Sequence, residues 1–465
     1  MITAGRHEVC KAFPVRLTGL DTAFLCLDRD VSPMHLGALA IFRGLRAADS
    51  GRVAALLADR AESVPRLRQR VQPAGFPLAA ASWADDPGFC AKDHIQLHHL
   101  EAGSGPEGAA ALAANLMVQP LARNRPLWEI HVIDGLGESR FAVLFKMHHA
   151  FGDGLNALEI AAQVLDEARP QGADLKPHGP PTGSPPATTS PGLLERLGRL
   201  TAGLPGTVEG VIEQAGELAG MAASVLRTVQ LPPPSSPLVV SSSGQRALAL
   251  AQLDLRQVRR IRASYGGTVN DALLAILAGA LRDWLIGRGA AVDGLVFRAF
   301  IPVSRRARSG NRSGANQLSG YLCPLPISEP DPGERLLMIR SAMERNKAGG
   351  ARRGGGAIPL LADLLPPAVH RFVAPAAGQT ASLLFDLMVT SIPLPGRRFT
   401  LDRADLEAVY PLAPLAAGQA LVVGLSWYRD RAYVALLADR PGLPDVTQLA
   451  EAVPPAAAAL AGVVT

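Results

Sequence analysis

Cysteine is scarce in this chain, which has only four among its 465 residues. The four are far apart, and no Cys-x-x-Cys pair occurs that would suggest zinc binding or redox chemistry. They are also too few for a disulfide framework, so a reduced, cytoplasmic setting fits best. The cysteines are Cys10, Cys26, Cys90 and Cys323.

Long apolar runs are missing as well, although 48% of the residues are hydrophobic. No stretch reaches the roughly 20 uninterrupted apolar residues that a transmembrane helix requires. The first 17 residues lack the apolar core of a signal peptide. We therefore expect any contact with a membrane to be peripheral.

Charge is also limited: charged residues make up 19% of the chain, and the formal net charge is +5. No Lys/Arg block occurs, and no basic stripe is interleaved with aromatic residues, which argues against nucleic acid as a partner. The small positive excess still allows a weak attraction to anionic lipid surfaces.

The chain length predicts two domains of about 200 residues each. The composition changes at 169–191, where Pro, Gly, Ser and Thr dominate, and again at 231–237. Between these breaks, leucines at helical spacing predict one or two amphipathic helices within 192–230, which either pack on the domains or touch lipid. We predict an N-terminal domain over 1–170, a linker over 171–245 and a C-terminal domain over 246–465.

Both predicted domains mix helix and strand patterns, which indicates α/β architecture. In the C-terminal part, a helix pattern has Asp271 near its start and Gly287 past its end, and a hairpin pattern turns at 429–431. Compact apolar runs predict buried strands in both parts. The predicted strands are 36–42, 141–147, 295–304 and the hairpin 420–439, and the predicted helices are 51–64, 154–168 and 268–289.

Two adjacent histidines, His148 and His149, follow the predicted strand at 141–147 directly. The sequence AFGDG and a helix pattern come next. Side chains at the end of a strand can reach into a cleft while the sheet holds them rigid. A neutral imidazole at such a place can take a proton from an alcohol near pH 7. The alternative is a pair of buried, hydrogen-bonded histidines with no chemical role.

Asp153 follows His149 by four residues and has a glycine on either side, Gly152 and Gly154. It can therefore fold back to hold the loop or to cap the helix that follows. Two adjacent histidines and this aspartate match no common zinc spacing, and the three histidines within 94–99 are more typical of a strand with polar edges. Because no G-x-S-x-G motif occurs, direct base-assisted transfer is the simplest scheme.

The motif H-H-x-x-x-D-G is typical of the chloramphenicol-acetyltransferase-like acyltransferases, which include the condensation domains of peptide synthetases. Further blocks, in family order over about residues 15 to 450, make the chain resemble the bacterial wax ester synthase/diacylglycerol acyltransferases. Two blocks depart from the family pattern, since Ala315 precedes Asn316 and the later block reads Ser-Ile-Pro-Leu-Pro at 391–395. The matching blocks include 17–42, Pro126-Leu127-Trp128, Asn270-Asp271, 300–306 and 389–396.

The resemblance implies two α/β domains with mixed sheets and an active-site channel at their interface. It implies that His149 is the general base, that His148 shapes the site, and that Asp153 holds the loop through Arg305 or Arg306. Asn270 is the candidate oxyanion donor, although an N-cap role fits it equally well. The resemblance further implies substrate-binding roles for four residues, of which Trp128 also fits plain core packing. These four are Gly154, Pro126, Leu127 and Trp128.

The implied activity is an acyl-CoA-dependent O-acyltransferase that makes wax esters from long-chain alcohols or triacylglycerol from diacylglycerol. Acyl-CoA would be a substrate, no metal or cofactor would be needed, and the enzyme would act at the cytoplasmic face of a membrane or at lipid inclusions. One alternative is a condensation-type acyltransferase for another hydroxyl or an amine, against which the lack of carrier and adenylation segments in this sequence argues. The other is an inactive lipid-binding protein of the same fold, against which the intact motif argues.

Overall fold

The computed structural model describes residues 15–44, 50–73, 81–137, 139–167, 236–304, 318–349, 370 and 381–463. The predicted linker helices within 192–230 lie outside these residues, as do Arg305, Arg306, Ala315 and Asn316. Within the described part, no helix is both long and apolar enough to cross a bilayer.

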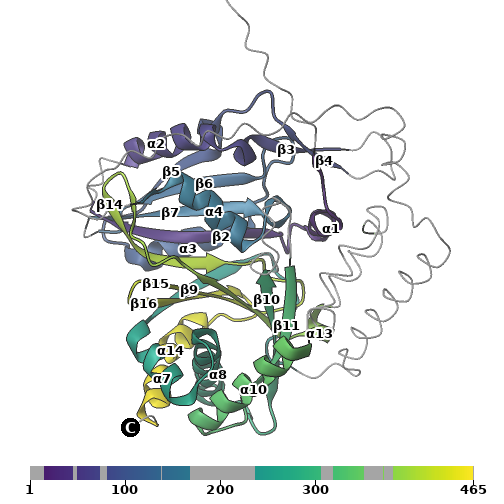
Figure 1. Ribbon diagram of the computed structural model, residues 1–465, viewed down its shortest axis with the longest axis vertical. Helices are drawn as coiled ribbons and strands as arrows, with labels where there is room; N and C mark the ends of the chain where they lie inside the picture. The colour runs from purple at the N-terminus through teal and green to yellow at the C-terminus, as the bar shows by residue number, and fades with distance from the viewer. Residues whose placement is uncertain are drawn as a thin grey trace, which may run out of the picture.

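Two mixed sheets organise the molecule, one in each half of Figure 1. The seven-stranded sheet contains one parallel pair, β5–β6, and the six-stranded sheet contains two, β10–β12 and β12–β15. The first sheet has the order β5 (Ile95–His99), β6 (Trp128–Asp134), β7 (Arg140–His148), β2 (His35–Arg43), β14 (Ala404–Leu412), β13 (Phe399–Leu401) and β8 (Asp166–Glu167). The second has the order β11 (Leu318–Pro326), β10 (Val296–Ser304), β12 (Leu387–Pro393), β15 (Leu421–Tyr428), β16 (Arg431–Asp439) and β9 (Arg246–Asp254).

Helices cover both faces of the first sheet. The helices α2 (Ser50–Ser63) and α4 (Gly154–Val164) contact each other on one face. The helix α3 (Gly105–Val118) packs on β2 and β7 from the other side and also contacts β9, so it lies between the two sheets (Figure 1). A short helix, α1 (Gly19–Leu27), approaches the end of β7, and a small sheet of β1 (Val15–Arg16), β4 (Ser82–Asp85) and β3 (Gln69–Gln72) lies nearby. Single 3-10 turns occur at Pro65–Arg68, Ala91–His94 and His149–Phe151, the last called η4.

The second sheet packs on a layer of helices at the bottom of Figure 1. The central helix of this layer, α8 (Val269–Gly287), is almost wholly buried because it is apolar on nearly every side. It begins at the N-cap Thr268, whose side chain accepts the Asp271 N–H while Asp271 accepts from the Thr268 N–H. The interpretation of Asn270 as N-cap is therefore wrong. The helices of this layer are α7 (Leu255–Tyr265), α8 (Val269–Gly287), α10 (Pro332–Gly349) and α14 (Val446–Gly462), and a one-turn helix, α13 (Ala381–Leu384), lies apart from them beside β11 (Figure 1).

The two halves exchange strands. After β12 in the second sheet, the chain crosses to form β13 and β14 in the first sheet and then returns as β15. The sheets meet where β14 contacts β15, and a side chain at Gly424 would collide with the Pro411 carbonyl oxygen. The domain boundaries near 170 and 245 stay a prediction, because 168–235 lies outside the described residues.

Within the described residues, the elements predicted from apolar patterns are confirmed, including the strands β2 and β7 and the hairpin β15–β16. That hairpin turns at Arg429, which adopts a φ of 57°, and Asp430. The helix predicted over 154–168 ends earlier, at Val164. Residues 166–167 pair with β13 instead, a long-range contact that helical periodicity does not reveal.

Candidate active site

The two histidines of the motif occupy different environments at the end of β7. His148 is the last residue of the strand, and its backbone N–H donates to the Leu127 carbonyl at 3.0 Å. His149 opens the turn η4, and its backbone N–H donates to the Met34 carbonyl at 2.7 Å. Because side chains alternate along a strand, Phe145 and Met147 share a face with the pocket described below, whereas His148 points to the opposite face.

His149 is enclosed on one side and open on the other. Its ring stacks on Phe24 of α1, with 4.0 Å between the ring centroids and 21° between their planes. Its Nδ1 atom is shielded from solvent, while the residue as a whole is half-buried and lines the pocket. Burial lowers the pKa of His149 to about 4, and His148 acts in the same direction against a backbone hydrogen bond that raises it. His149 is therefore a neutral imidazole near pH 7.

His148 is held by a carboxylate that is remote in sequence. Its Nδ1 accepts the Ala150 N–H at 3.0 Å, so the proton of the neutral ring is on Nε2, which lies 3.5 Å from Asp28 Oδ2. Burial tends to raise the pKa of Asp28, but His148 and the Met34 N–H outweigh it and hold that pKa well below its usual range. Sequence reasoning missed Asp28, because nothing local links residue 28 to residue 148.

Asp153 caps the helix that follows the histidines. It is 1% exposed, and its Oδ1 accepts the Asn156 N–H at 2.9 Å as N-cap of α4. Gly152 is required here, because a Cβ on it would lie 2.7 Å from Asn156 Cβ. A Cβ on Gly154 would lie 3.1 Å from Ile392 Cδ1, so this position brings α4 close to β12. The expectation that Asp153 caps the helix is confirmed, and a contact with Arg305 or Arg306 stays a prediction.

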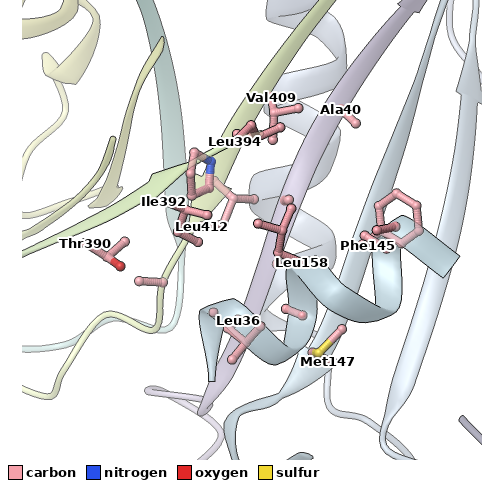
Figure 2. Close-up of a pocket in the computed structure, with 18 of the residues that line it drawn as sticks. Leu36, Ala40, Phe145, Met147, Leu158, Thr390, Ile392, Leu394, Val409 and Leu412 are labelled. Carbon is pink, nitrogen blue, oxygen red and sulfur yellow. The ribbon is translucent and has the colours of Figure 1, made fainter. Parts of the chain in front are cut away.

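An apolar pocket of about 980 Å³, part of it open to solvent, lies between α4 and the first sheet. Strand β12 of the second sheet closes one side, so both halves of the chain contribute to it (Figure 2). Among its described lining residues, only His149 and Thr390 have polar side chains, and none is charged. Small and aliphatic residues form the wall along α4 and directly after it, namely Ala157, Leu158, Ala161, Ala162 and Leu165.

Asn270 lies behind β12 rather than in this pocket. Its Oδ1 accepts the Ser391 hydroxyl at 2.5 Å. Ser391 stands between Thr390 and Ile392, which both line the pocket, so its side chain points to the other face of the strand. Asn270 is thus close to the pocket wall but does not itself line the pocket.

The Pro-Leu-Trp segment supports the site from within the core. Leu127 and Trp128 are each 1% exposed, and Trp128 Nε1 donates to the Leu67 carbonyl at 2.8 Å. Trp128 also stacks on His94, and the Leu127 carbonyl accepts from His148 as described above. Of the four predicted substrate-binding residues, Gly154 alone is at the pocket, and Pro126, Leu127 and Trp128 do not line it.

Three further histidines, His98, His99 and His131, lie on the outer strands β5 and β6 of the first sheet. His98 Nε2 is 3.1 Å from His131 Nδ1, and His99 Nδ1 is 2.8 Å from Asp134. No group of three or more His, Cys, Asp or Glu in the described parts of the chain could hold a metal ion. The strand prediction is confirmed for His98 and His99, which lie on β5, whereas His94 ends the 3-10 turn before that strand and stacks on Trp128.

Comparison with known proteins gives consistent matches along the chain. Residues 17–273 match the wax ester synthase/diacylglycerol acyltransferase catalytic domain, and residues 314–460 match the C-terminal domain of the same family. The probable diacylglycerol O-acyltransferase tgs1 of Mycobacterium tuberculosis is 30% identical over 457 residues, which cover 96% of both chains. The probable diacylglycerol O-acyltransferase tgs2 of the same organism is 30% identical over 444 residues, covering 92% of this chain and 95% of the relative.

Solved structures show the same fold. The wax ester synthase/diacylglycerol acyltransferase from Marinobacter aquaeolei VT8 has a TM-score of 0.68 at 24% identity, covering 97% of this chain and 100% of that chain. A starter condensation domain of rhizomide synthetase, solved with C8-CoA, has a TM-score of 0.55 at 14% identity, covering 94% and 95%. The chain therefore belongs to the wax ester synthase/diacylglycerol acyltransferase family and is an O-acyltransferase with the two-domain fold of the chloramphenicol-acetyltransferase-like enzymes.

Proposed function

We propose that the enzyme transfers the acyl group of an acyl-CoA to the hydroxyl of a long-chain alcohol or a diacylglycerol. The observation that carries this proposal is a neutral His149 at an apolar pocket that the two halves of the chain form together. A neutral imidazole can accept a proton, and an apolar pocket can hold a hydrocarbon chain while it excludes water. The relatives' names as diacylglycerol O-acyltransferases support the same substrate class.

The proposed reaction needs one base and no covalent acyl-enzyme. Nδ1 of His149 is shielded from solvent, so we assign the proton transfer to Nε2. Nε2 takes the hydroxyl proton as the alcohol oxygen attacks the thioester carbon. The carbon–sulfur bond then breaks, and His149 returns the proton to the CoA thiolate. Acyl-CoA is a substrate in this scheme, and no cofactor takes part.

The oxyanion that forms during attack needs a hydrogen-bond donor. Asn270 stays our candidate, although its position behind β12 makes the contact less direct than the sequence suggests. Its Oδ1 is occupied by the Ser391 hydroxyl, so Nδ2 would be the donating group. Asp153 would act through the helix α4 that it caps rather than on the proton.

Both substrates and the product are poorly soluble in water. We therefore propose that the enzyme works in peripheral contact with the cytoplasmic face of a membrane or with lipid inclusions. Attraction to anionic lipid would add to apolar contact in such an arrangement. Co-sedimentation with vesicles should then rise with anionic lipid content and fall with salt concentration. Vesicle binding that changes with neither variable would contradict the proposed attraction to anionic lipid.

A product assay tests the proposed reaction. Purified enzyme is given labelled palmitoyl-CoA together with hexadecanol, a diacylglycerol or a long-chain amine, and ester, amide and free CoA are measured. We expect ester and an equal amount of free CoA. Amide as the main product would favour the condensation-type alternative, and no CoA release with any acceptor would favour an inactive lipid-binding protein.

Replacement of the base tests the mechanism. His149→Ala should lower turnover about 100-fold or more, as expected for loss of a general base. His99→Ala is the matched control, because His99 is exposed at the sheet edge and pairs with Asp134. It should keep wild-type turnover. Near wild-type turnover in a folded His149→Ala variant would show that another group moves the proton.

A further inference from the structure

Residues 28–34 join α1 to β2 and pass beside both histidines, and we call them the strap. The strap turns tightly, since the Arg29 and Ser32 backbones exchange hydrogen bonds of 3.4 and 3.0 Å. Its two ends are tied together, because the Met34 N–H donates to Asp28 Oδ1 at 2.8 Å. The strap is therefore a closed loop of defined shape.

Each end of the strap holds one histidine. At one end, Asp28 Oδ2 accepts a hydrogen bond from Arg123 Nη2 at 2.6 Å, and it lies 3.5 Å from His148 Nε2, a contact too long to be a formed hydrogen bond. At the other end, the Met34 carbonyl accepts the His149 N–H at 2.7 Å. Asp28 is only 15% exposed in its side chain, so its interaction with His148 is poorly screened by water.

The ring of His148 transmits this contact to the turn that presents the base. Nδ1 of His148 accepts the N–H of Ala150, the residue after His149. This arrangement requires the proton on Nε2, toward Asp28. If the proton moved to Nδ1, two N–H groups would face each other and the hydrogen bond to Ala150 would be lost.

The middle of the strap is anchored on the other half of the molecule. Arg246 Nη2 donates to the Val31 carbonyl at 2.8 Å, and the Ser32 hydroxyl donates to the Leu415 carbonyl at 2.7 Å. Arg246 is itself buried beside Asp439. The strap thus connects both histidines to residues that follow the linker in the chain.

We propose that Asp28 is a positioning residue of the transfer reaction: together with the Ala150 N–H it fixes the Nε2–H tautomer of His148, whose ring orders the turn that carries His149. The proposal rests on the proposed function, because it takes His149 as the base. A displacement of about 1 Å in a reacting group can cost about 100-fold in rate, so this indirect contact is large enough to measure.

Kinetics of matched aspartate variants test the proposal. Asp28→Ala should lower kcat fivefold or more with KM within twofold, and Asp28→Asn should lose less, because its amide oxygen can still lie beside the Nε2–H of His148. Asp445→Ala is the control, since Asp445 is similarly exposed, at 19%, and likewise accepts from one arginine and one N–H donor. It should keep kcat within twofold. A loss of less than fivefold in folded Asp28→Ala overturns the proposal.

A second measurement does not depend on turnover, so it separates this proposal from the proposed reaction. Nitrogen-15 NMR of histidine-labelled enzyme reports which ring nitrogen of His148 bears the proton, with His148→Gln to assign its signals. We expect Nε2–H in the wild type, Asp28→Asn and Asp445→Ala, and a switch or mixture of tautomers in Asp28→Ala. If Asp28→Ala does not fold, Asp28→Ser, with a hydroxyl too short to reach His148, replaces it in both experiments. An unchanged tautomer in the variant overturns the proposal even if the enzyme is fully active.

Discussion

At the scale of single residues, the site depends on keeping one imidazole neutral. Burial lowers the pKa of His149 to about 4, whereas an exposed histidine would be partly protonated near neutrality. Desolvation would therefore keep the proposed base in its neutral, proton-accepting form over a wide pH range. The same burial makes it a weaker base, so the rate must also depend on how closely the hydroxyl is positioned.

This pKa leads to a prediction for the pH–rate profile. The kcat/KM of the free enzyme should stay flat from pH 8 to about pH 5 and fall only as the pH approaches 4, since His149 must be neutral to accept the proton. Initial rates measured after brief transfer to each pH, with folding checked by circular dichroism, test this. An acid limb near pH 6.5 would instead mean that His149 is solvated like a free histidine.

The sequence singles out His149, the proposed base, but not the residues that surround it. His149 stands out because two histidines, an aspartate and a glycine occur together after a strand pattern. Asp28 is 120 residues away from His148 and belongs to a helix end, so no local pattern relates them. Phe24, which stacks on His149, looks like an ordinary core residue of a short helix for the same reason.

At the scale of elements, the helix α4 begins at the N-cap Asp153 and forms one wall of the pocket. Its pocket side has Ala157, Ala161 and Ala162 where larger residues would fill the space, while Gln163 on the same helix is exposed. Small residues on a helix that faces a sheet leave room for a hydrocarbon chain between the helix and the sheet. The length of substrate hydrocarbon chain that the pocket accepts should therefore depend on the size of the residues on this side of α4.

We predict that Ala161→Leu shifts the preference toward shorter chains. The added carbons would occupy pocket volume, and such a change is typically worth about tenfold or more in kcat/KM between chain lengths. The measurement compares C8 to C18 acyl-CoAs with one alcohol, and C8 to C18 alcohols with one acyl-CoA. Whichever series shifts identifies the substrate whose chain enters the pocket.

The control for this variant is Gln163→Leu, which adds a leucine on the exposed side of the same helix. It should leave both chain-length series unchanged. If Ala161→Leu shifts neither series while remaining active, the pocket beneath α4 holds neither chain.

Elements with strong local periodicity could be predicted from the sequence, and elements that depend on distant partners could not. The strands β2 and β7 and the hairpin β15–β16 follow from alternating or continuous apolar runs. By contrast, β13 and β14 leave the second sheet to pair with β8 and β2, and no feature of residues 399–412 alone indicates which sheet they join. Part of the pocket wall comes from this exchange, through Phe399, Leu406 and Val409.

At the scale of the whole molecule, the buried polar groups near the histidines make stability depend on pH. Burial, reinforced by the Lys146 charge, lowers the pKa of His35 to about 4, and His35 Nδ1 is 2.9 Å from the Met117 carbonyl oxygen. His149 has a similarly lowered pKa. The folded protein thus keeps two histidines neutral that the unfolded chain protonates near pH 6.5.

The sign of the effect follows from proton binding. Above pH 6.5 both states hold these histidines neutral, and they contribute no pH dependence. Between pH 6.5 and about 4 the unfolded chain binds more protons, so the free energy of unfolding falls as pH falls, by up to about 1.4 kcal/mol per pH unit for each histidine. The half-buried carboxylates Asp28 and Glu129 have lowered pKa values, so their contribution is lost only at lower pH, below about 4.5.

We therefore predict that the urea midpoint falls between pH 6.5 and 4.5, before the carboxylates titrate. His35→Asn should reduce this slope, because an amide can still donate to the Met117 carbonyl but cannot bind a proton in this range. Urea unfolding followed by tryptophan fluorescence at half-unit pH steps gives the slope for wild type and variant. His99→Asn serves as the control, since His99 is largely exposed and should leave the slope nearly unchanged. An equal slope in His35→Asn and wild type would show that His35 is not held neutral, and the loss of stability would then have to come from other buried groups of the fold.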